Sequence, residues 1–296
     1  MKKEIAQQYE NVSPELKALW EVELDLLAEF KAVCEKHHLR WFADGGTLLG
    51  AVRHSGFIPW DDDVDIIMPY DDYCKLCSLS GEFKEPYFLQ TWKTNEGSRP
   101  FLSRLRRSDT TGYTYRESFC PENWNKGIFI DIFALCYIPD NFIVSRTQNI
   151  LLKSIRTVYF GYQSKRDGFP AADNKYLDYF LKSTYTVFNA IGRSKDLSNL
   201  LDTYVKLGGW QKEGSKYCAP LLFRPYYKGL IWKTEWYKET VMLDFMDMTV
   251  PCPKDYDNRL KSQYGDYMTP VKAPTNHGGI TYNTNHSYRV KNADGN

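Results

Sequence analysis

The sequence contains no long apolar segment. Its 296 residues include no run of about 18 apolar residues, the length that a membrane-spanning helix needs. The first ten residues, MKKEIAQQYE, also lack the apolar stretch of a secretory signal peptide. We therefore expect a protein that is neither exported by that route nor inserted in a membrane, and that resides in the cytoplasm.

Net charge is almost absent as well. Thirty-eight Lys and Arg residues oppose 37 Asp and Glu residues, which gives a formal net charge of +1. Nothing in the overall charge attracts such a chain to nucleic acid or to an anionic membrane. We expect no nucleic-acid partner, and any charge that matters for function must be local.

Cysteines are few and lack the pattern of a disulfide framework. There are seven, an odd number, and they are scattered along a long chain, which is typical of reduced thiols in the cytoplasm. Cys74 and Cys77 form a Cys-x-x-Cys motif, but no second Cys or His pair stands at zinc spacing. We therefore expect no zinc site.

The remaining composition is that of a folded globular protein. Hydrophobic residues make up 43% and charged residues 25%, far from the profile of a disordered chain. Aromatic residues are plentiful at 16%, which fits either an aromatic-rich core or a surface that stacks on sugars or bases. The length allows one large domain or a catalytic domain with an elaborated second half.

Apolar spacing and turn residues predict the elements of the first half. Ser13, Pro14 and Glu15 mark the start of a helix that apolar spacing extends to about residue 37. Beyond it we expect a strand at 39–43, a glycine turn, helical turns at 47–53, a strand at 64–68, a helix at 71–79, and strands at 101–106 and 127–133.

The second half is expected to be mainly helical. Helices are predicted at 148–162 and 174–191, and a third is capped by Ser194 and ends at Gly208 and Gly209. A short helix at 255–264 stands in a loop-rich C-terminal stretch. This change of character suggests a catalytic core at 1–145 and a helical, loop-rich region at 146–296.

Aspartates are concentrated between residues 61 and 72, where six of the twelve positions are aspartate. On a strand, Asp61, Asp63 and Asp65 would project to one face and Asp62 to the other. Two carboxylates about 4 Å apart repel by roughly 4 kcal/mol at an effective dielectric constant of about 20, so they share either a proton or a cation. Oxygen ligands without a nearby His or Cys favour Mg²⁺, or Mn²⁺ in its place, with open positions for substrate phosphates.

A solvated loop that caps the next helix is the alternative explanation for these acids. It accounts well for Asp71 and Asp72. Asp63 and Asp65 instead stand in an otherwise apolar segment, where an unneutralised charge is costly. We therefore predict that these two residues ligate a metal.

A glycine turn supplies a complementary feature. Gly45 and Gly46 would let the backbone approach a phosphate closely, and the N–H groups that open the next helix, from Thr47 on, favour negative charge. An ordinary strand-to-helix turn would look the same. The nearby aspartates favour the phosphate interpretation.

These residues belong to a longer stretch, WFADGGTLLGAVRHSGFIPWDDDVDI at 41–66, that closely resembles the signature of the LicD family. Weaker similarities lie at 101–111, 127–133, 139–140, 250–256 and 264–268. The segment from about 141 to 215 has no motif support. The family is similar to nucleotidyltransferase-fold enzymes, so the resemblance implies an α/β (α+β) fold in which a small mixed sheet is flanked by helices, with a helix-rich C-terminal half.

The resemblance also implies roles for individual residues. Gly45 and Gly46 would hold donor phosphates, and Asp63 and Asp65 would ligate metal together with Asp131 from a separate strand. Asp131 is also unusual by itself, as an acid inside an apolar segment. Sixteen residues separate Gly46 from Asp63, a longer gap than nucleotidyltransferases generally show, although LicD-like sequences share it.

Bacterial LicD-like proteins transfer phosphocholine from CDP-choline to sugars of teichoic acid, lipopolysaccharide or related glycans. Fukutin-like relatives transfer ribitol phosphate from CDP-ribitol. The implied reaction is attack by a sugar hydroxyl on the donor phosphorus that carries the head group, with CMP leaving. Metals on Asp63, Asp65 and Asp131, with Asp61 nearby, would serve it. The candidates for the remaining phosphate charge are Arg53, Arg104 and Arg106, which could equally be solvated.

Other roles depend on the donor and the acceptor. His54 and His277 could accept the acceptor's proton or simply complete hydrogen-bond networks. A choline head group would need an aromatic cage, and the second half offers Trp210, Tyr226, Tyr227, Trp232, Trp236 and Tyr237. A glycan or lipid-linked glycan acceptor at the inner face of the membrane could bring Lys153 and Arg156 against lipid, unless their helix is a plain core helix.

Two rival interpretations remain open. A glycosyltransferase that binds a nucleotide sugar through an Asp-x-Asp motif would also contain the sequence from Asp63 to Asp65. The other rival is a catalytically silent nucleotidyltransferase-like module that serves for binding. The presence of all the glycines and aspartates named above argues against a silent module.

Overall fold

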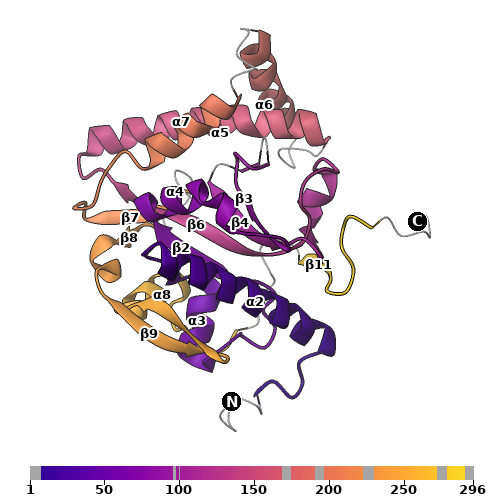
Figure 1. The fold of residues 1–296 in the computed structure, drawn as a ribbon. Coiled ribbons are helices and arrows are strands. Elements are labelled where there is room, and N and C mark those ends of the chain that lie inside the picture. Colours follow the sequence, from indigo (N-terminus) through magenta and orange to yellow (C-terminus); the bar gives the residue numbers. More distant parts are fainter. Residues whose placement is uncertain are drawn as a thin grey trace.

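The computed structural model describes residues 8–95, 98–99, 101–168, 175–190, 197–222, 230–271 and 279–290. Figure 1 shows a central sheet with α5, α6 and α7 above it and α2, α3 and α8 below it. The helices that lie above come from the middle of the chain, and the lower layer combines the N-terminal and C-terminal parts.

The main sheet is mixed, as predicted, and has seven strands. Five of them follow the order β1-β2-β6-β4-β3, in which β2 and β6 are parallel and the other neighbours are antiparallel. Their bounds are Phe42–Ala43 (β1), Asp65–Pro69 (β2), Tyr87–Gln90 (β3), Leu102–Arg107 (β4) and Ile128–Ile138 (β6). The two remaining strands come from the second half: β7 (Tyr217–Pro220) pairs with the end of β6, and β8 (Trp232–Lys233) pairs with β7.

Two small sheets extend this framework. One joins β9 (Thr240–Phe245) and β10 (Met248–Pro253), and the other joins β5 (Thr111–Thr114) and β11 (Ile280–Asn283). The strands of the second half were not predicted. They carry the C-terminal part of the chain back onto the core, since β10 contacts β1 and β9 contacts α3.

The helix α2 (Pro14–Lys36) confirms the predicted helix at 14–37 and begins as its sequence suggests. The Ser13 hydroxyl accepts a hydrogen bond of 3.2 Å from the N–H of Leu16, and proline occupies the first turn. The apolar face of α2 packs on β6 and β4. This long helix therefore covers one face of the sheet at its central strands.

Short helices connect the strands of the core. They are α3 (Gly45–His54), α4 (Tyr70–Ser78), η1 (Ser80–Glu82), η2 (Tyr115–Phe119), η6 (Thr234–Tyr237) and α8 (Tyr256–Tyr264). The glycine turn predicted before 47–53 is itself the first turn of α3. The backbone N–H groups of both glycines therefore open that helix.

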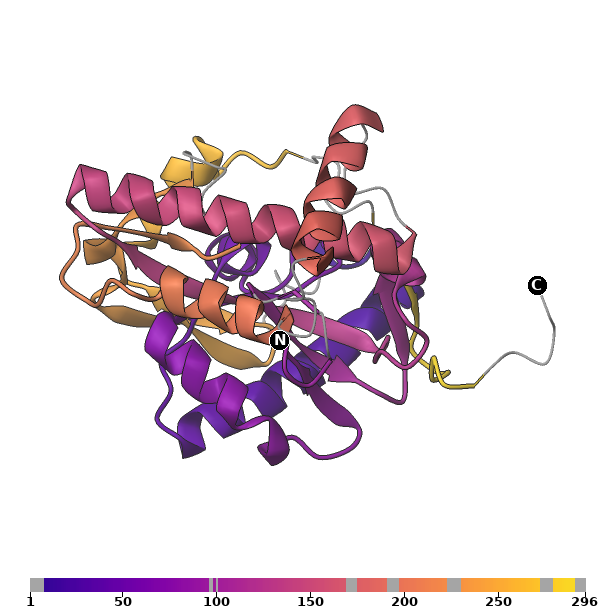
Figure 2. The ribbon, with the colours of Figure 1, turned by 90° about the horizontal axis from the view of Figure 1, so that it is seen from above.

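The middle of the chain is helical, as predicted. Figure 2 shows α5 (Phe142–Asp167) running across the molecule, with contacts to α6 (Lys175–Phe188) and α7 (Leu197–Gly208). Residue 145, where we placed the end of the core, lies inside α5, and the division into two regions stays a prediction. Ser194 lies outside the described residues. No helix among the described ranges has the length and apolarity to cross a membrane.

Candidate functional site

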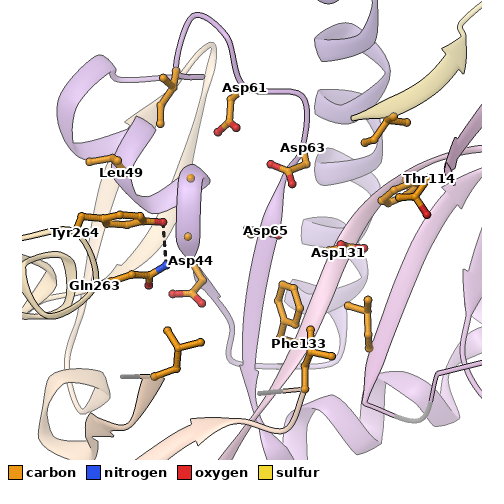
Figure 3. A pocket seen from close by; sticks show the side chains of 18 of the residues that line it. Asp44, Leu49, Asp61, Asp63, Asp65, Thr114, Asp131, Phe133, Gln263 and Tyr264 are labelled. Atoms are coloured by element: carbon orange, nitrogen blue, oxygen red, sulfur yellow. Dashed lines mark hydrogen bonds between the residues drawn. The ribbon is translucent and has the colours of Figure 1, made fainter. Parts of the chain in front are cut away.

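A cavity of about 980 Å³ opens where the first turn of α3 meets the middle of the sheet and α8. Figure 3 shows Asp61 and Asp63 at one end of it, with Asp65 and Asp131 on adjacent strands and Tyr264 and Gln263 across from them. Residues far apart in the sequence therefore share one cavity. It contains most of the residues that the sequence suggested for the site.

The sheet register sets three charged residues side by side. Asp65 on β2 is the register partner of Asp131 on β6, and Asp131 is in turn the partner of Arg104 on β4. Arg104 Nε donates to Asp131 Oδ1 at 2.6 Å. Asp131, predicted as an acid from a separate strand, thus lies between a second carboxylate and a guanidinium group.

The loop before β2 holds the densest group of acids. Asp61, Asp62 and Asp63 each have a carboxylate oxygen within 4.8 Å of the others, and no other group of three or more His, Cys, Asp or Glu residues in the described ranges is as close. Asp61 and Asp63 line the cavity. We expected Asp62 to point away from them, but β2 begins only at Asp65, so strand alternation does not apply to this loop.

The two glycines lie directly against the acids. A methyl group on Gly45 would lie 2.5 Å from Asp65 Oδ2, and one on Gly46 would overlap Asp61 Oδ2. Gly45 also has a φ of 53°, which side chains rarely adopt. Both glycines line the cavity, so the start of α3 presents backbone N–H groups beside the carboxylates.

Thr47 does not line the cavity. Its buried hydroxyl oxygen accepts a hydrogen bond of 2.8 Å from the N–H of Asp65. This bond fixes the start of β2 against α3. Thr47 therefore positions Asp65, and the structure gives no contact between its hydroxyl and the cavity.

Ionisation of Asp65 is disfavoured at this position. Burial raises the pKa of Asp65 well above its usual range, and the neighbouring Asp63 and Asp131 add to the effect. An all-oxygen set of this kind fits Mg²⁺ or Mn²⁺, and a divalent cation would relieve the repulsion. The donor set that fits best is the Asp61–Asp63 loop, with Asp65 and Asp131 next to it in the same cavity.

Sequence reasoning missed a further acid. Glu23 on α2 is fully buried, and neither of its carboxylate oxygens has a hydrogen-bond partner. Burial raises its pKa well above the usual range, with Asp63, Asp61 and Asp62 adding to the shift. Its signal in the sequence was an acid inside the apolar stripe of a helix, among the buried residues Leu19, Trp20, Leu26 and Leu27.

The predicted arginines divide into two groups. Arg104 lines the cavity, and although burial alone would lower its pKa, the carboxylates of Asp131 and Glu117 raise it. Arg106 does not line the cavity; it is fully buried and donates to Glu117, to Gln90 and to two backbone carbonyls. Its contacts hold the β4 region together and leave it no role toward a phosphate.

Arg53 lines the cavity at the end of α3 and donates to the backbone carbonyl of Tyr267 at 2.8 Å. Arg53 Nε also donates to His54 Nε2, so this ring nitrogen carries no proton. The proton is therefore on His54 Nδ1, which donates to Gln8 Oε1. Burial and the Arg53 charge lower the pKa of His54 to about 4. His54 is therefore a network residue, and His277 lies outside the described residues.

Four more arginines line the cavity without having been predicted for phosphate: Arg99, Arg116, Arg156 and Arg259. For Arg156 we left open either lipid contact or a place on a core helix; its guanidinium carbon lies 4.4 Å from the ring centre of Phe101, and it donates to the carbonyl of Leu222. No sequence motif indicates these positions, because tertiary packing brings them to the cavity from α5, α8, η2 and the segment before β4.

Of the suggested choline-cage residues that the structure describes, only Trp232 lines the cavity. Its ring lies 3.5 Å from the guanidinium carbon of Arg259, so one face of it is occupied. Trp210 is 62% exposed, Trp236 and Tyr237 pack against the core, and Tyr226 and Tyr227 lie outside the described residues. All seven cysteines are free.

Known proteins resemble this chain over the segment that contains the acidic loop. Residues 38–160 match the LicD/FKTN/FKRP nucleotidyltransferase domain. The chain is 28% identical over 267 residues to the lipopolysaccharide cholinephosphotransferase LicD of Haemophilus influenzae, covering 83% of this chain and 88% of that protein. It is 37% identical over 60 residues to an uncharacterised protein of Rickettsia prowazekii, which covers 20% of this chain and 23% of that one.

A more distant relative is the human ribitol 5-phosphate transferase FKRP, 43% identical over 49 residues, which make up 17% of this chain and 10% of FKRP. The matched domain contains the glycines of α3, the acidic loop and Asp131. Between residues 38 and 160, the chain therefore matches a nucleotidyltransferase domain of the LicD/FKTN/FKRP type.

Proposed function

We propose that this protein is a divalent-cation-dependent transferase that moves a phosphorylated head group, phosphocholine or an alditol phosphate, from a CDP-linked donor to a glycan hydroxyl. The observation that carries the proposal is the composition of the cavity. Carboxylates and the N-terminus of α3 lie at one end, and six arginines line the same cavity: Arg53, Arg99, Arg104, Arg116, Arg156 and Arg259. This arrangement suits a ligand that brings both phosphates and a cation.

The acids are the proposed cation ligands. Asp61 and Asp63 face the cavity from one loop, and Asp65 and Asp131 face it from adjacent strands. Bound Mg²⁺ or Mn²⁺ would neutralise charge on the donor phosphates and on the leaving CMP. Arg104 is held against Asp131, so it is placed to orient that carboxylate as well as to face a phosphate.

The chain's own groups would position the two reactants. The first N–H groups of α3 and the arginines bind the phosphate oxygens, and the apolar and aromatic lining excludes water from them. The acceptor oxygen then forms a bond to the phosphorus that bears the head group, the bond from that phosphorus to CMP breaks, and the hydroxyl proton is released. Phosphoryl-type transfer depends mainly on such positioning and charge neutralisation.

Donor preference tests the proposal. CDP-choline or CDP-ribitol with MgCl₂ should raise the melting temperature of the protein, whereas UDP-glucose should not. Stabilisation by UDP-sugars alone would favour the Asp-x-Asp glycosyltransferase instead. The similarity to a cholinephosphotransferase over most of both chains supports a CDP-linked donor.

We also propose that the acceptor is a glycan or lipid-linked glycan of cell-surface polysaccharide, teichoic acid or lipopolysaccharide, reached at the inner face of the cell membrane. The exposed face of α6 supports peripheral contact: Tyr176 is 87% and Tyr179 75% exposed, and Phe180 and Val187 follow on the same helical face. Co-sedimentation with anionic phospholipid vesicles, lost in a Tyr179→Ser/Phe180→Ser variant, tests this contact. Equal sedimentation of both proteins would contradict it.

A further inference from the structure

Glu23 has no evident structural purpose where it stands. It lies in the middle of the buried face of α2, with none of its surface exposed, and both carboxylate oxygens lack a hydrogen-bond partner. A carboxyl group in such a place is costly, and a leucine would pack there without that cost. It is too far from either end of α2 to cap the helix.

The position of Glu23 relative to the acidic loop is well defined. Trp20, three residues earlier and thus on the same face of α2, donates from its indole nitrogen to the backbone carbonyl of Asp61 at 2.9 Å. This bond holds α2 against the loop. Glu23 therefore lies on the face of α2 that packs against this loop, and the nearby Asp63, Asp61 and Asp62 add to the rise in its pKa.

Glu23 does not belong to the proposed ligands themselves. It does not line the cavity, and the compact group of oxygens comprises Asp61, Asp62 and Asp63 only. It also lies before the segment that matches the family domain. Its carboxylate can therefore act on a cation at the loop only from behind the ligands, by adding negative potential there.

We propose that Glu23 is a positioning residue that strengthens divalent-cation binding by the Asp61–Asp63 loop. The inference rests on the cation site of the proposed function. A carboxylate behind the ligands is repelled by the empty loop and attracted by a bound cation, which favours the loaded loop. Residues that support metal ligands in this way typically change metal affinity by about 10- to 100-fold when they are removed.

Glu23→Gln tests the proposal, because it replaces the carboxyl group with an amide of the same shape that cannot ionise. Titration with MnCl₂, followed by electron paramagnetic resonance of free Mn²⁺, should show about 10- to 100-fold weaker binding than in the wild type. Without cation the variant should melt at the same or a higher temperature. Its rise in melting temperature on adding Mn²⁺ should be smaller.

Glu21→Gln is the matched control, because Glu21 is exposed on the same helix and undergoes the same chemical change. Its Mn²⁺ affinity should stay within about twofold of the wild type, since exposed charges act weakly. Equal affinities in Glu23→Gln, Glu21→Gln and the wild type would overturn the proposal. If Glu23→Gln does not fold, Glu23→Leu replaces it; wild-type Mn²⁺ affinity in that variant would overturn the proposal as well.

The outcomes separate this inference from the proposed function. Mn²⁺ binding that depends on Glu23, without turnover of any CDP-linked donor, would support the inference and reject the function. Turnover with Mn²⁺ affinity unchanged in Glu23→Gln would do the reverse. Absence of Mn²⁺ binding by the wild type would reject both.

Discussion

Arg259 on α8 donates from a terminal guanidinium nitrogen to Asp44 Oδ1 at 2.5 Å, although 215 positions separate the two residues. Asp44 is the residue that precedes α3, and its side chain pairs with Arg259 instead of capping the helix. The pair is almost fully buried, and the Trp232 ring covers the guanidinium group. The C-terminal helix thus fixes the turn from which Gly45 and Gly46 begin.

Breaking this pair should destabilise the protein strongly. Arg259→Met leaves the Asp44 carboxylate buried without its partner, which should lower the free energy of unfolding by about 3–5 kcal/mol in urea titrations. The double variant Asp44→Asn/Arg259→Met should recover part of that loss. Strictly additive effects of the two single substitutions would show that the residues are not coupled.

The two glycines of α3 should respond differently to alanine. Gly46 has no positive φ, so alanine is tolerated by the backbone, but its methyl group must displace the Asp61 carboxylate. We expect Gly46→Ala to remain folded and to bind Mn²⁺ at least about tenfold more weakly. Gly45→Ala adds a strained φ and should also lose about 1–2 kcal/mol of stability. Calorimetric titration and urea unfolding of both variants measure these effects.

Asp63→Asn should abolish transfer, because it removes a cavity-lining ligand from the acidic loop. A loss of at least about 100-fold in Mg²⁺-dependent CMP release is expected. Asp71→Asn is its control, since Asp71 is exposed and paired with Lys212 away from the cavity. Undiminished turnover in Asp63→Asn and Asp65→Asn would show that the site is elsewhere or that these acids are silent.

His54 should make stability depend on pH on the acid side. Its pKa is about 4 in the folded protein against 6.5 ordinarily, so between these values the unfolded chain binds more protons and stability falls as the pH decreases. Solvent screens part of this effect at a partly buried site, so the free energy of unfolding should fall by about 1 kcal/mol. Urea unfolding from about pH 7 to about pH 4.5 should show a shallower decline in His54→Gln. Parallel curves would contradict the assignment.

The local elements could be predicted because their signals are local. Ser13, Pro14 and the apolar spacing behind them place α2 almost to the residue, and the acids in apolar surroundings identify Asp65 and Asp131 as residues of interest. What the sequence could not provide is the register that makes Asp65 and Asp131 neighbours, since that depends on the pairing of distant strands.

The arrangement around the site was less predictable for the same reason. Arg106 and Arg104 are two positions apart on β4, yet only Arg104 lines the cavity, while Glu117 and backbone carbonyls hold Arg106. Arg259 reaches the site only because β9 and β10 fold the C-terminal part back onto α3 and β1. Tertiary packing, which no short motif encodes, decides each of these roles.

The most direct test of the account is donor turnover. Purified protein, MgCl₂ and a glycan acceptor are incubated with CDP-choline, CDP-ribitol or UDP-glucose, and released nucleotide is separated by chromatography, with Asp63→Asn as the inactive control. The account predicts CMP release from a CDP-linked donor that requires Mg²⁺ and Asp63, together with the head-group phosphate on the acceptor. Release of UDP from UDP-glucose, with no CMP from either CDP-linked donor, would contradict it.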